Sequence, residues 1–375
     1  MLEIQKYLAA RSQLGAKNRL KVWSAMQGLN LAPHSNDPLV ILNYDQIDSP
    51  KSGPARLCRS LVLNTLDNSL VSRSFERFFN LGEMLDEADK FDWSNFSCLE
   101  KLDGSLICIH YFNDKWYLRT RGSWADSKIE FQDFTWFEAV CKAIDCVPED
   151  FQKECNRLLD KKLTYVCEFC SPWNKVVRQY KEPYLYLLTC FDGEKELALD
   201  ELQFCEFFWE PRRYQFSSLE DIKKYIQEQE STDKTWEGVV VRDVNNQRWK
   251  IKSSTYVSLH QMRGEGDNMF NPKYLIPWIL AGDTSELLTY FPEVSSKLSQ
   301  LTSLLDEEFD NLARLWIKTW KIEDQKEFAL AIVGKSKYSS MLFNLRKQLG
   351  KNQTLSDLQK FWRGSANTLI KSLKS

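Results

Sequence analysis

The chain changes character after Lys252. Before that residue, short runs of β-branched and aromatic residues alternate with helical stretches at irregular intervals, which is typical of an α+β fold rather than a regular βαβ series. After it, apolar residues recur at steps of three and four from Val294 to Trp316, which predicts an amphipathic helix. We therefore expect a mixed domain over residues 1–263 and an all-helical domain over residues 264–375, divided at a glycine-containing segment.

The pattern predicts the following elements. Strands are expected at residues 59–63, 98–101, 106–112, 116–121, 164–170, 184–191, 238–242 and 248–252. Helices are expected at residues 131–144, 150–159 and 219–230 of the first domain and at residues 325–333, 339–348 and 355–373 of the second. Residues 1–31 are expected to be helical, and residues 34–54, interrupted by prolines, are expected to form loops.

Composition allows a sizeable core, and charge is concentrated at one end. The chain has 375 residues, 43% hydrophobic and 13% aromatic, so we expect two or three folded domains. The net charge is −2, yet residues 335–375 carry nine Lys or Arg against one acid, a net +8 that leaves −10 on the rest. This basic end indicates either contact with a polyanion or a solvated helix face.

Cysteine usage indicates a reducing compartment. The ten cysteines follow no regular spacing, and the C-x-x-C pair of Cys167 and Cys170 lies in an apolar stretch, which favours a buried strand over a zinc site. The first residues are charged without an apolar signal segment, and no run of about 18 apolar residues occurs. We expect a cytoplasmic monomer without membrane contact.

Lys101 begins the sequence Lys-Leu-Asp-Gly. Asp103 and Gly104 form a strong tight-turn signal, and apolar runs on both sides predict a strand entering and a strand leaving. Lys101 would then lie at a strand end, on a rigid scaffold that faces a pocket. A lysine nucleophile must lose its proton, and neighbouring cations or a metal lower its ordinary pKa of about 10.4. Taken alone, the motif is more often an exposed hairpin with a surface lysine.

Glu168 lies in an alternating run from Thr164 to Cys170, where it would share a strand face with apolar neighbours. A carboxylate on an apolar face is costly unless it meets a cation or a metal. The alternative is a strand-end glutamate that faces water, and this residue alone leaves both interpretations open.

Lys250 and Lys252 lie two residues apart in a predicted strand, so they point to the same face. The preceding strand begins with Glu237 and Gly238. Two ammonium groups that converge on one spot repel each other unless a polyanion such as a triphosphate lies between them. In isolation, a solvent-facing edge strand is the commoner explanation of such a pair.

The order of these elements resembles the nucleotidyltransferase superfamily of ligases and capping enzymes. Its signature is a K-x-D-G motif, a downstream glutamate strand, an E-G strand and a K-x-K strand, and all four occur here in that order. A narrower resemblance, to the RNA ligase 1 family of T-even phages, is carried by SFERFFNLGE (74–83), EFCSPWNKVV (168–177), KIKSSTYVSLH (250–260), Asn43-Tyr44 and Cys58-Arg59. It covers residues 42–260 and extends weakly into the helical region.

The resemblance implies a nucleotidyltransferase domain with antiparallel sheets around an ATP pocket, in which Lys101 takes AMP covalently. The implied catalytic residues are Lys101, Arg121, Glu237, Lys250 and Lys252. The implied ATP-binding residues are Asn43, Tyr44, Arg59, Arg77, Glu100, Lys101, Asp103, Gly104, Glu168, Glu237, Lys250, Lys252 and Tyr256. The implied ligands of Mg²⁺ (or Mn²⁺) are Glu168, Glu237, Asp283 and Glu286, the last two at the loosely aligned start of the helical domain.

Four positions depart from the pattern of the resembled family. Arg77 and Arg121 stand where lysine is usual, which keeps the charge but replaces a compact ammonium with a planar fork. Ser60 replaces a glycine, and Leu42 replaces an aromatic residue near the adenine. The nucleophile motif itself is intact.

The resemblance implies an ATP-dependent RNA ligase that joins 5′-phosphate and 3′-hydroxyl RNA ends through lysyl-AMP and an RNA-adenylate. Its expected partner is RNA with such ends, selected by the helical domain, with a broken tRNA as a candidate, in a bacterium or a phage-infected cell. A DNA ligase or capping enzyme is the first alternative, but both normally carry an all-β OB domain where a helical pattern lies here. A catalytically inactive nucleotide- or RNA-binding relative is the second alternative, and the intact motifs argue against it.

Overall fold

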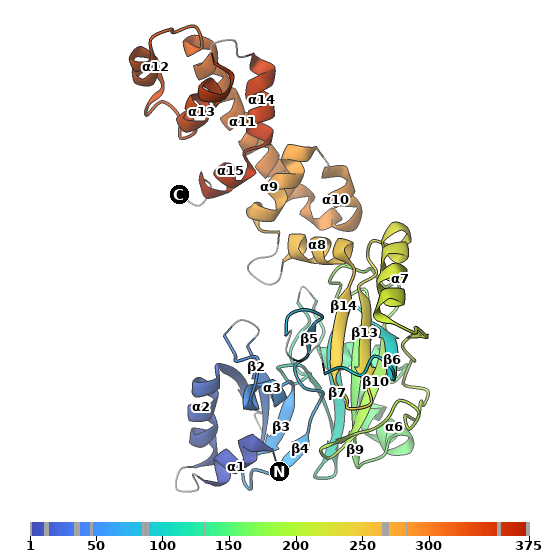
Figure 1. The fold of residues 1–375 in the computed structure, drawn as a ribbon. Helices are drawn as coiled ribbons and strands as arrows, with labels where there is room; N and C mark the ends of the chain where they lie inside the picture. The colour runs from blue at the N-terminus through green and yellow to red at the C-terminus, as the bar shows by residue number, and fades with distance from the viewer. Residues whose placement is uncertain are drawn as a thin grey trace. The chain divides into compact units, whose positions relative to one another are not determined.

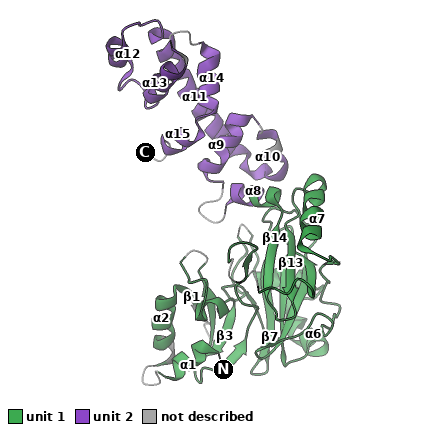
Figure 2. Ribbon diagram, viewed as in Figure 1, with its two compact units in different colours: residues 1–257 green, residues 258–375 purple. Residues whose placement is uncertain are grey.

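The structure is a computed structural model that describes residues 2–10, 15–33, 38–45, 48–84, 87, 90–130, 132–264, 270–282, 284–350 and 354–372. The chain divides into two compact units, residues 1–257 and 258–375 (Figure 2). The division falls inside helix α8 (Ser254–Arg263), whereas the boundary expected from sequence lies at the end of that helix. The described residues include no helix that is both long and apolar enough to cross a membrane.

The strands of unit 1 form three sheets (Figure 1). Sheet 1 runs β1-β2-β3-β4, with bounds Leu29–Pro33, Leu39–Tyr44, Leu61–Asn64 and Leu70–Ser72. Sheet 2 runs β11-β10-β9-β7-β8, with bounds Lys195–Glu196, Tyr184–Asp192, Leu163–Cys170, Ser105–Phe112 and Lys115–Thr120. Sheet 3 runs β12-β6-β13-β14-β5, with bounds Arg213–Tyr214, Phe96–Glu100, Gly238–Asp243, Arg248–Lys252 and Phe79–Asn80. Among these strands β14 and β5 pair parallel and the other pairs are antiparallel.

Helices cover one face of each sheet in unit 1. Their bounds are α1 Glu3–Ala9, α2 Ala16–Gln27, α3 Pro54–Leu57, α5 Trp136–Ala143, the 3₁₀ turn Pro148–Asp150, α6 Phe151–Leu158 and α7 Leu219–Thr232. Helix α5 begins with a capping box, in which Thr135 accepts from the Glu138 N–H and Glu138 accepts from Thr135. Ile222 and Ile226 of α7 join the core of sheet 3.

Alternation along β9 gives sheet 2 two different faces. Cys167 and Phe169 point into the core shared with α5 and α6. Val166 points to the opposite face, into an apolar cluster that includes Phe78 and Val240 of sheet 3. Glu168 shares the face of Val166, so its carboxylate lies on the side of sheet 2 that meets sheet 3.

The described elements of unit 2 are helices, most of which bury side chains in one apolar core. Their bounds are α9 Pro272–Ala281, α10 Thr284–Tyr290, the 3₁₀ turn Pro292–Val294, α11 Ser295–Thr319, α12 Gln325–Ile332, α13 Ser339–Leu349, α14 Leu355–Arg363 and α15 Ala366–Ser372. Helix α11 buries a stripe that includes Leu298, Leu305, Leu312 and Trp316, which is the repeat of three and four seen in the sequence.

Several sequence expectations on elements are wrong. Residues 29–31, expected to be helical, are part of β1, because Gly28 adopts a left-handed conformation that ends α2. Residues 39–44 form β2 inside a region expected to be loops, because the run LVILNY is apolar enough to be buried in sheet 1. The helix expected over residues 131–144 begins only at Trp136. The helix expected over residues 355–373 is divided at Gly364 into α14 and α15.

Candidate active site

Lys101 directly follows β6, where the chain crosses from sheet 3 to sheet 2. The expected hairpin at the Asp-Gly turn is wrong, because β6 and β7 belong to different sheets and do not pair. The Asp103 carboxylate instead accepts hydrogen bonds from the backbone N–H groups of Val177 (2.8 Å) and Arg178 (2.6 Å) and from the Tyr256 hydroxyl (2.7 Å). Asp103 therefore anchors a crossover between two layers.

Two glycines allow the close backbone approaches on which the site depends. A Cβ on Gly104 would lie 2.4 Å from the Phe169 carbonyl oxygen of β9. Gly238 has φ +136°, and a Cβ there would lie 2.2 Å from the Ile251 carbonyl oxygen of β14. Only glycine fits either position without moving a strand. The Gly238 carbonyl oxygen also accepts the Lys101 N–H at 2.9 Å, which fixes the backbone of the candidate nucleophile.

Strand register places Lys101, Glu237 and Lys252 side by side. Gly238 lies opposite Lys252 in the β13–β14 pair, and Val239 lies opposite Glu100, the residue before Lys101. The Lys101 Nζ lies 2.9 Å from Glu237 Oε2, and the Lys252 Nζ lies 2.8 Å from Glu237 Oε1. The Glu237 side chain is 4% exposed and the Lys101 side chain 19%. The candidate nucleophile thus lies in a largely buried cluster of charges and is not a surface lysine.

Lys250 is a desolvated lysine on the same face. Its Nζ lies 4.7 Å from the centre of the Phe78 ring. Burial and the positive charges of Arg59, Lys101 and Lys252 lower the pKa of Lys250 to about 6. An anion placed among these groups would remove the repulsion and restore the charge on Lys250.

Arg59 is a buried cation close to Lys250. Its guanidinium lies 5.0 Å from the centres of both the Phe75 and Phe78 rings. Its Nε and Nη1 are buried and have no hydrogen-bond partner among the described residues. Burial lowers the pKa of Arg59. Donors of this kind fit the oxygens of a phosphate group.

The carboxylates balance these cations only in part. Burial raises the pKa of Glu168 to about 7, although Lys101 and Arg59 act in the opposite direction. Burial acts to lower the pKa of Lys101, but the carboxylates of Glu237, Glu168 and Asp103 outweigh it, so that pKa lies above its ordinary value. The protein's own groups therefore favour a protonated Lys101. We name Lys101, Glu168, Glu237, Lys250, Lys252 and Arg59 the nucleophile cluster.

Tyr44 gathers two further arginines beside Arg59. The Arg77 guanidinium lies 4.6 Å and the Arg121 guanidinium 5.7 Å from the centre of the Tyr44 ring. Arg59 is close enough to Tyr44 and Arg121 for their charges to act on its pKa. Asn43, on the next position of β2, is buried, and its Oδ1 has no hydrogen-bond partner among the described residues.

Three of the expected site residues lie apart from this cluster or outside the description. Glu100 turns to Arg178, whose Nη1 lies 3.2 Å from Glu100 Oε1. Asp283 lies outside the described residues, and for Glu286 only the backbone, in α10, is described. Among the described residues no group of three His, Cys, Asp or Glu side chains could hold a metal by itself. A divalent metal would need phosphate oxygens in addition to Glu168 and Glu237, which is the usual mode of Mg²⁺.

Ser60 and Arg119 form a link that the sequence did not predict. Ser60 adopts φ +56°, and its Oγ accepts from Arg119 Nε (2.9 Å) and donates to the Thr120 carbonyl oxygen (2.9 Å). Arg119 is completely buried, and it also donates to the Ser60 carbonyl oxygen (2.8 Å) and bonds His110 Nδ1 (2.9 Å). The link joins the neighbours of Arg59 and Arg121. The sequence shows that Ser60 departs from the family's glycine, but it does not show that Arg119 is the buried partner of Ser60.

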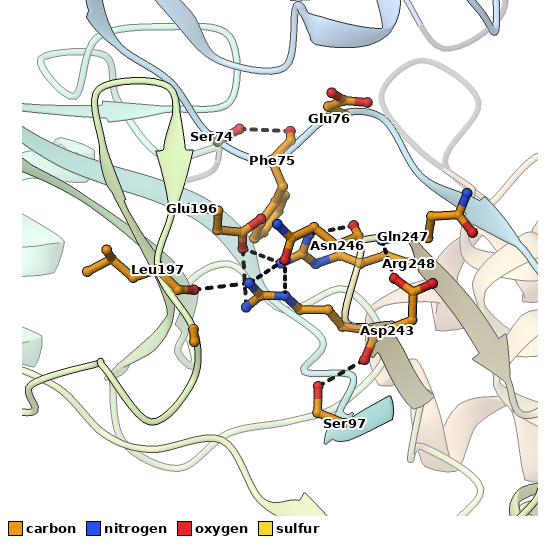
Figure 3. Close-up of polar contacts among 12 residues, drawn as sticks. Ser74, Phe75, Glu76, Ser97, Glu196, Leu197, Asp243, Asn246, Gln247 and Arg248 are labelled. Atoms are coloured by element: carbon orange, nitrogen blue, oxygen red, sulfur yellow. Dashed lines mark hydrogen bonds and ion pairs between the residues drawn. The ribbon is translucent and has the colours of Figure 1, made fainter. Parts of the chain in front are cut away.

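A second buried charge cluster lies at the other end of β14, as Figure 3 shows. Glu196 of β11 pairs with Arg248, which begins β14, and lies 3.6 Å from Arg242 of β13. Arg242 also donates to the Leu197 carbonyl oxygen (3.0 Å) and to Asn246 Oδ1 (2.9 Å). We name Glu196, Arg242, Asn246 and Arg248 the hairpin cluster. It ties the β13–β14 hairpin to sheet 2 and so fixes the strand that carries the paired lysines.

A lysine paired with a carboxylate among excess cations is an arrangement suited to binding a polyphosphate. Comparison with known proteins gives the family. The family model described as RNA ligase matches residues 57–258, more than half of the chain. The chain therefore belongs to the RNA ligase family, and the family expected from the sequence motifs is confirmed.

Two curated relatives carry consistent names. One is "Putative bifunctional polynucleotide kinase/RNA ligase" of Autographa californica nuclear polyhedrosis virus, 30% identical over 311 residues, which are 79% of this chain and 42% of that protein. The other is "Putative RNA ligase" of Thermovibrio ammonificans, 27% identical over 214 residues, which are 55% of this chain and 53% of that protein. The chain spans about half the length of the curated relatives it matches.

Solved structures are similar only at a low level. An archaeal ATP-dependent RNA ligase (form 2) is 13% identical, with a TM-score of 0.44 over 88% of this chain and 78% of that chain. A putative ATP-dependent DNA ligase from Aquifex aeolicus is 14% identical, with a TM-score of 0.44 over 95% of this chain and 98% of that chain. At these scores neither similarity decides between RNA and DNA as a substrate.

Proposed function

We propose that the chain is an ATP-dependent RNA ligase that acts through a covalent lysyl-AMP on Lys101. The observation that carries the proposal is the position of the Lys101 amine, 2.9 Å from Glu237 and close to Lys250, Lys252 and Arg59. A primary amine inside a site with an excess of buried cations is arranged to meet a phosphoryl group. Splitting strand joining into covalent steps is the usual benefit of such a nucleophile.

In the first step the Lys101 amine attacks the α-phosphorus of ATP, a bond from nitrogen to phosphorus forms, and pyrophosphate leaves. Lys250 and Lys252 face the α-phosphate and the leaving group, because both point to the face that holds Lys101. The unpartnered Nε and Nη1 of Arg59 take further phosphate oxygens. Positioned cations of this kind stabilise the charge that develops on phosphoryl oxygens in the transition state.

The proton on Lys101 must leave before the attack. Glu168 and Glu237 raise the pKa of Lys101, and we propose that the same two carboxylates hold a divalent metal. Asp283 and Glu286 are further candidates for metal ligands. Mg²⁺ or Mn²⁺ at these oxygens would supply the positive charge that offsets their effect on the amine. Glu237 would then be released from its pair with Lys101.

In the later steps AMP passes from Lys101 to a 5′-phosphate RNA end, and a 3′-hydroxyl displaces AMP to seal the strand. We assign these steps to residues 1–263 as the adenylyltransferase domain, with Tyr44, Arg77 and Arg121 near the phosphates. We assign residues 264–375 to an all-helical domain that selects the RNA, with the basic segment 335–375 as its phosphate contact. A broken tRNA is the proposed substrate and a monomer the proposed state.

Sealing assays test the proposal. Wild-type chain, ATP and Mg²⁺ are incubated with single-stranded 5′-phosphate RNA, nicked RNA and nicked DNA. We expect sealing of RNA and none by Lys101→Ala, which should retain its fold by circular dichroism. Preferential sealing of nicked DNA would favour a DNA ligase, and RNA binding without AMP transfer would favour an inactive relative. Helices in place of strands after Lys252, among the described residues, already disfavour the OB-domain enzymes.

A further inference from the structure

Three aromatic side chains form a row along the outer part of sheet 2. Tyr184 and Tyr186 lie on β10, and Trp209 lies beside that strand. The Trp209 N–H donates to the Leu185 carbonyl oxygen (2.9 Å), and the Leu187 N–H donates to the Trp209 carbonyl oxygen (3.0 Å). These two bonds hold the Trp209 backbone as a parallel bridge to Tyr186. The position of the indole is thus set by the sheet and not by a free loop.

The aromatic row lies on the same face as Glu168. Tyr186 pairs with Glu168 in the β9–β10 register, and directly paired residues share a face. The Tyr184 ring centre lies 5.2 Å from that of Trp209 and 5.9 Å from that of Tyr186, which places all three rings together. Strands are spaced about 4.8 Å apart, so the Trp209 backbone lies roughly 10 Å from that of Glu168. The row therefore leads outward from the nucleophile cluster.

The row faces solvent although its members are large. Trp209 is 55% exposed, and the two tyrosines are half-buried. The alternate residues of β10, Leu185 and Leu187, point to the other face and are buried in the core. Leaving an indole in water forgoes the stabilisation that its burial would give. Trp and Phe residues that are exposed in unit 1 are few among the described residues, with Phe204 at 37% the other one.

Arginines connect the row to the residue before the nucleophile. Arg178 pairs with Glu100 (3.2 Å) and Asp233 (3.6 Å), and its guanidinium lies 5.7 Å from the centre of the Tyr180 ring. The Arg212 carbonyl oxygen accepts the Glu100 N–H at 2.8 Å. Arg178 is close enough to Tyr186 for each group to act on the pKa of the other, so one guanidinium, paired with acids, lies near the row. This is the composition that binds unpaired nucleobases and their phosphates.

We propose that Tyr184, Tyr186 and Trp209 are the stacking surface for unpaired bases next to the reacting end of the RNA. The inference rests on the proposed function and adds to it a place and a form of substrate, single-stranded RNA. Duplex RNA buries its base faces in its own stack, so it cannot use this surface without local opening. The aromatic row sets affinity for the RNA end and takes no part in the transfer of AMP to Lys101.

The test compares Trp209→Ala and Trp209→Phe in the full chain. The probe is a 5′-phosphorylated single-stranded oligoribonucleotide with a blocked 3′ end, and its Kd is measured by fluorescence anisotropy. We expect Trp209→Ala to raise the Kd and the sealing KM about 10-fold with little change in kcat, since one base–aromatic stack has roughly that worth. Trp209→Phe should retain most of the affinity. Phe204→Ala, an exposed aromatic outside the row, should bind as the wild type does.

A second arm asks whether bases are what the row contacts. Abasic nucleotides at the reacting end should weaken binding to the wild type and have little effect on Trp209→Ala. Label from α-labelled ATP should appear at the wild-type rate in all variants. Wild-type affinity in both Trp209→Ala and Tyr184→Ala, or an equal abasic penalty in wild type and variant, overturns the inference. A wild-type chain that takes no label from ATP refutes the proposed function instead, and the binding arms still decide on the stacking surface.

Discussion

The two ends of β14 carry buried charges that are compensated to different degrees. In the hairpin cluster, Glu196 lies between Arg242 and Arg248, and carbonyl and amide oxygens take further guanidinium donors (Figure 3). In the nucleophile cluster, Glu237 is shared by two lysines, while Lys250 keeps a pKa of about 6 and Arg59 keeps two donors without partners among the described residues. The same strand thus begins in a network that is mostly balanced, although Arg242 Nη1 has no hydrogen bond among the described residues, and ends in one that is less so.

The difference teaches how to separate support from chemistry in a buried polar region. A balanced network costs little beyond its desolvation and holds the backbone in place. An unbalanced one costs stability in the absence of its ligand, and such a cost is retained where function requires it. We therefore expect the nucleophile cluster to bind the ligand and the hairpin cluster to hold β14 in position.

The largest expected effect is on folding, at the hairpin cluster. Glu196→Gln removes the charge that two buried arginines share, so the free energy of unfolding should fall by about 3–5 kcal/mol in urea denaturation. The control is Glu220→Gln, which breaks an exposed pair with Lys223 and should change the same quantity by less than about 1 kcal/mol. Equal effects of the two variants would remove the distinction between the clusters.

The next effect is on chemistry, at the nucleophile cluster. Lys250→Met removes a cation from the proposed phosphate site, so the rate of self-adenylylation should fall by about 10²–10³-fold. Because Lys250 is desolvated and repelled by its neighbours, the same change should leave the free energy of unfolding unaltered or higher. A destabilised variant with normal adenylylation would mean that Lys250 has a structural role.

Arg119 offers an intermediate case, since it is buried among neutral partners. Ser60→Ala leaves Arg119 Nε without its acceptor, and we expect a loss of about 1–3 kcal/mol in unfolding free energy with a higher KM for ATP. Ser60→Gly loses the same bond but relieves the left-handed φ of +56°, so it should be more stable than Ser60→Ala. A Ser60→Gly variant that is less stable than Ser60→Ala would contradict the backbone strain inferred at Ser60.

The last effect is on the pH dependence of stability. The folded pKa of Lys250, about 6, lies below its ordinary 10.5, so the unfolded chain binds more protons between these values and stability should rise with pH there. The folded pKa of Glu168, about 7, lies above its ordinary 4.5, so stability should fall as pH rises between those values. The free energy of unfolding is measured by urea titration at pH 5, 7 and 9. Its rise with pH should be absent in Lys250→Met, and its fall with pH should be absent in Glu168→Gln. Unchanged profiles in both variants would contradict these shifts.

Local patterns predicted much of the fold and part of the site. The strand of residues 248–252 is confirmed, as is the shared face of Lys250 and Lys252, because period-two alternation is a local property. The Asp-Gly signal was misread as a hairpin, because the partners that hold Asp103, namely Val177, Arg178 and Tyr256, are far along the chain. For the same reason, the pairing of Glu196 with Arg248 and the hydrogen bond between Arg119 and Ser60 could not be predicted from the sequence. Contacts between layers are set by packing, and spacing along the sequence does not report them.

Intact mass followed by peptide mapping tests the central claim most directly. The full chain is incubated with ATP and Mg²⁺ and compared with the untreated chain. We predict one added AMP per chain, mapped to the peptide that contains Lys101 and lost in Lys101→Ala. Transfer of AMP to any other residue, or no added AMP in a folded chain, would contradict a lysyl-adenylate at this crossover.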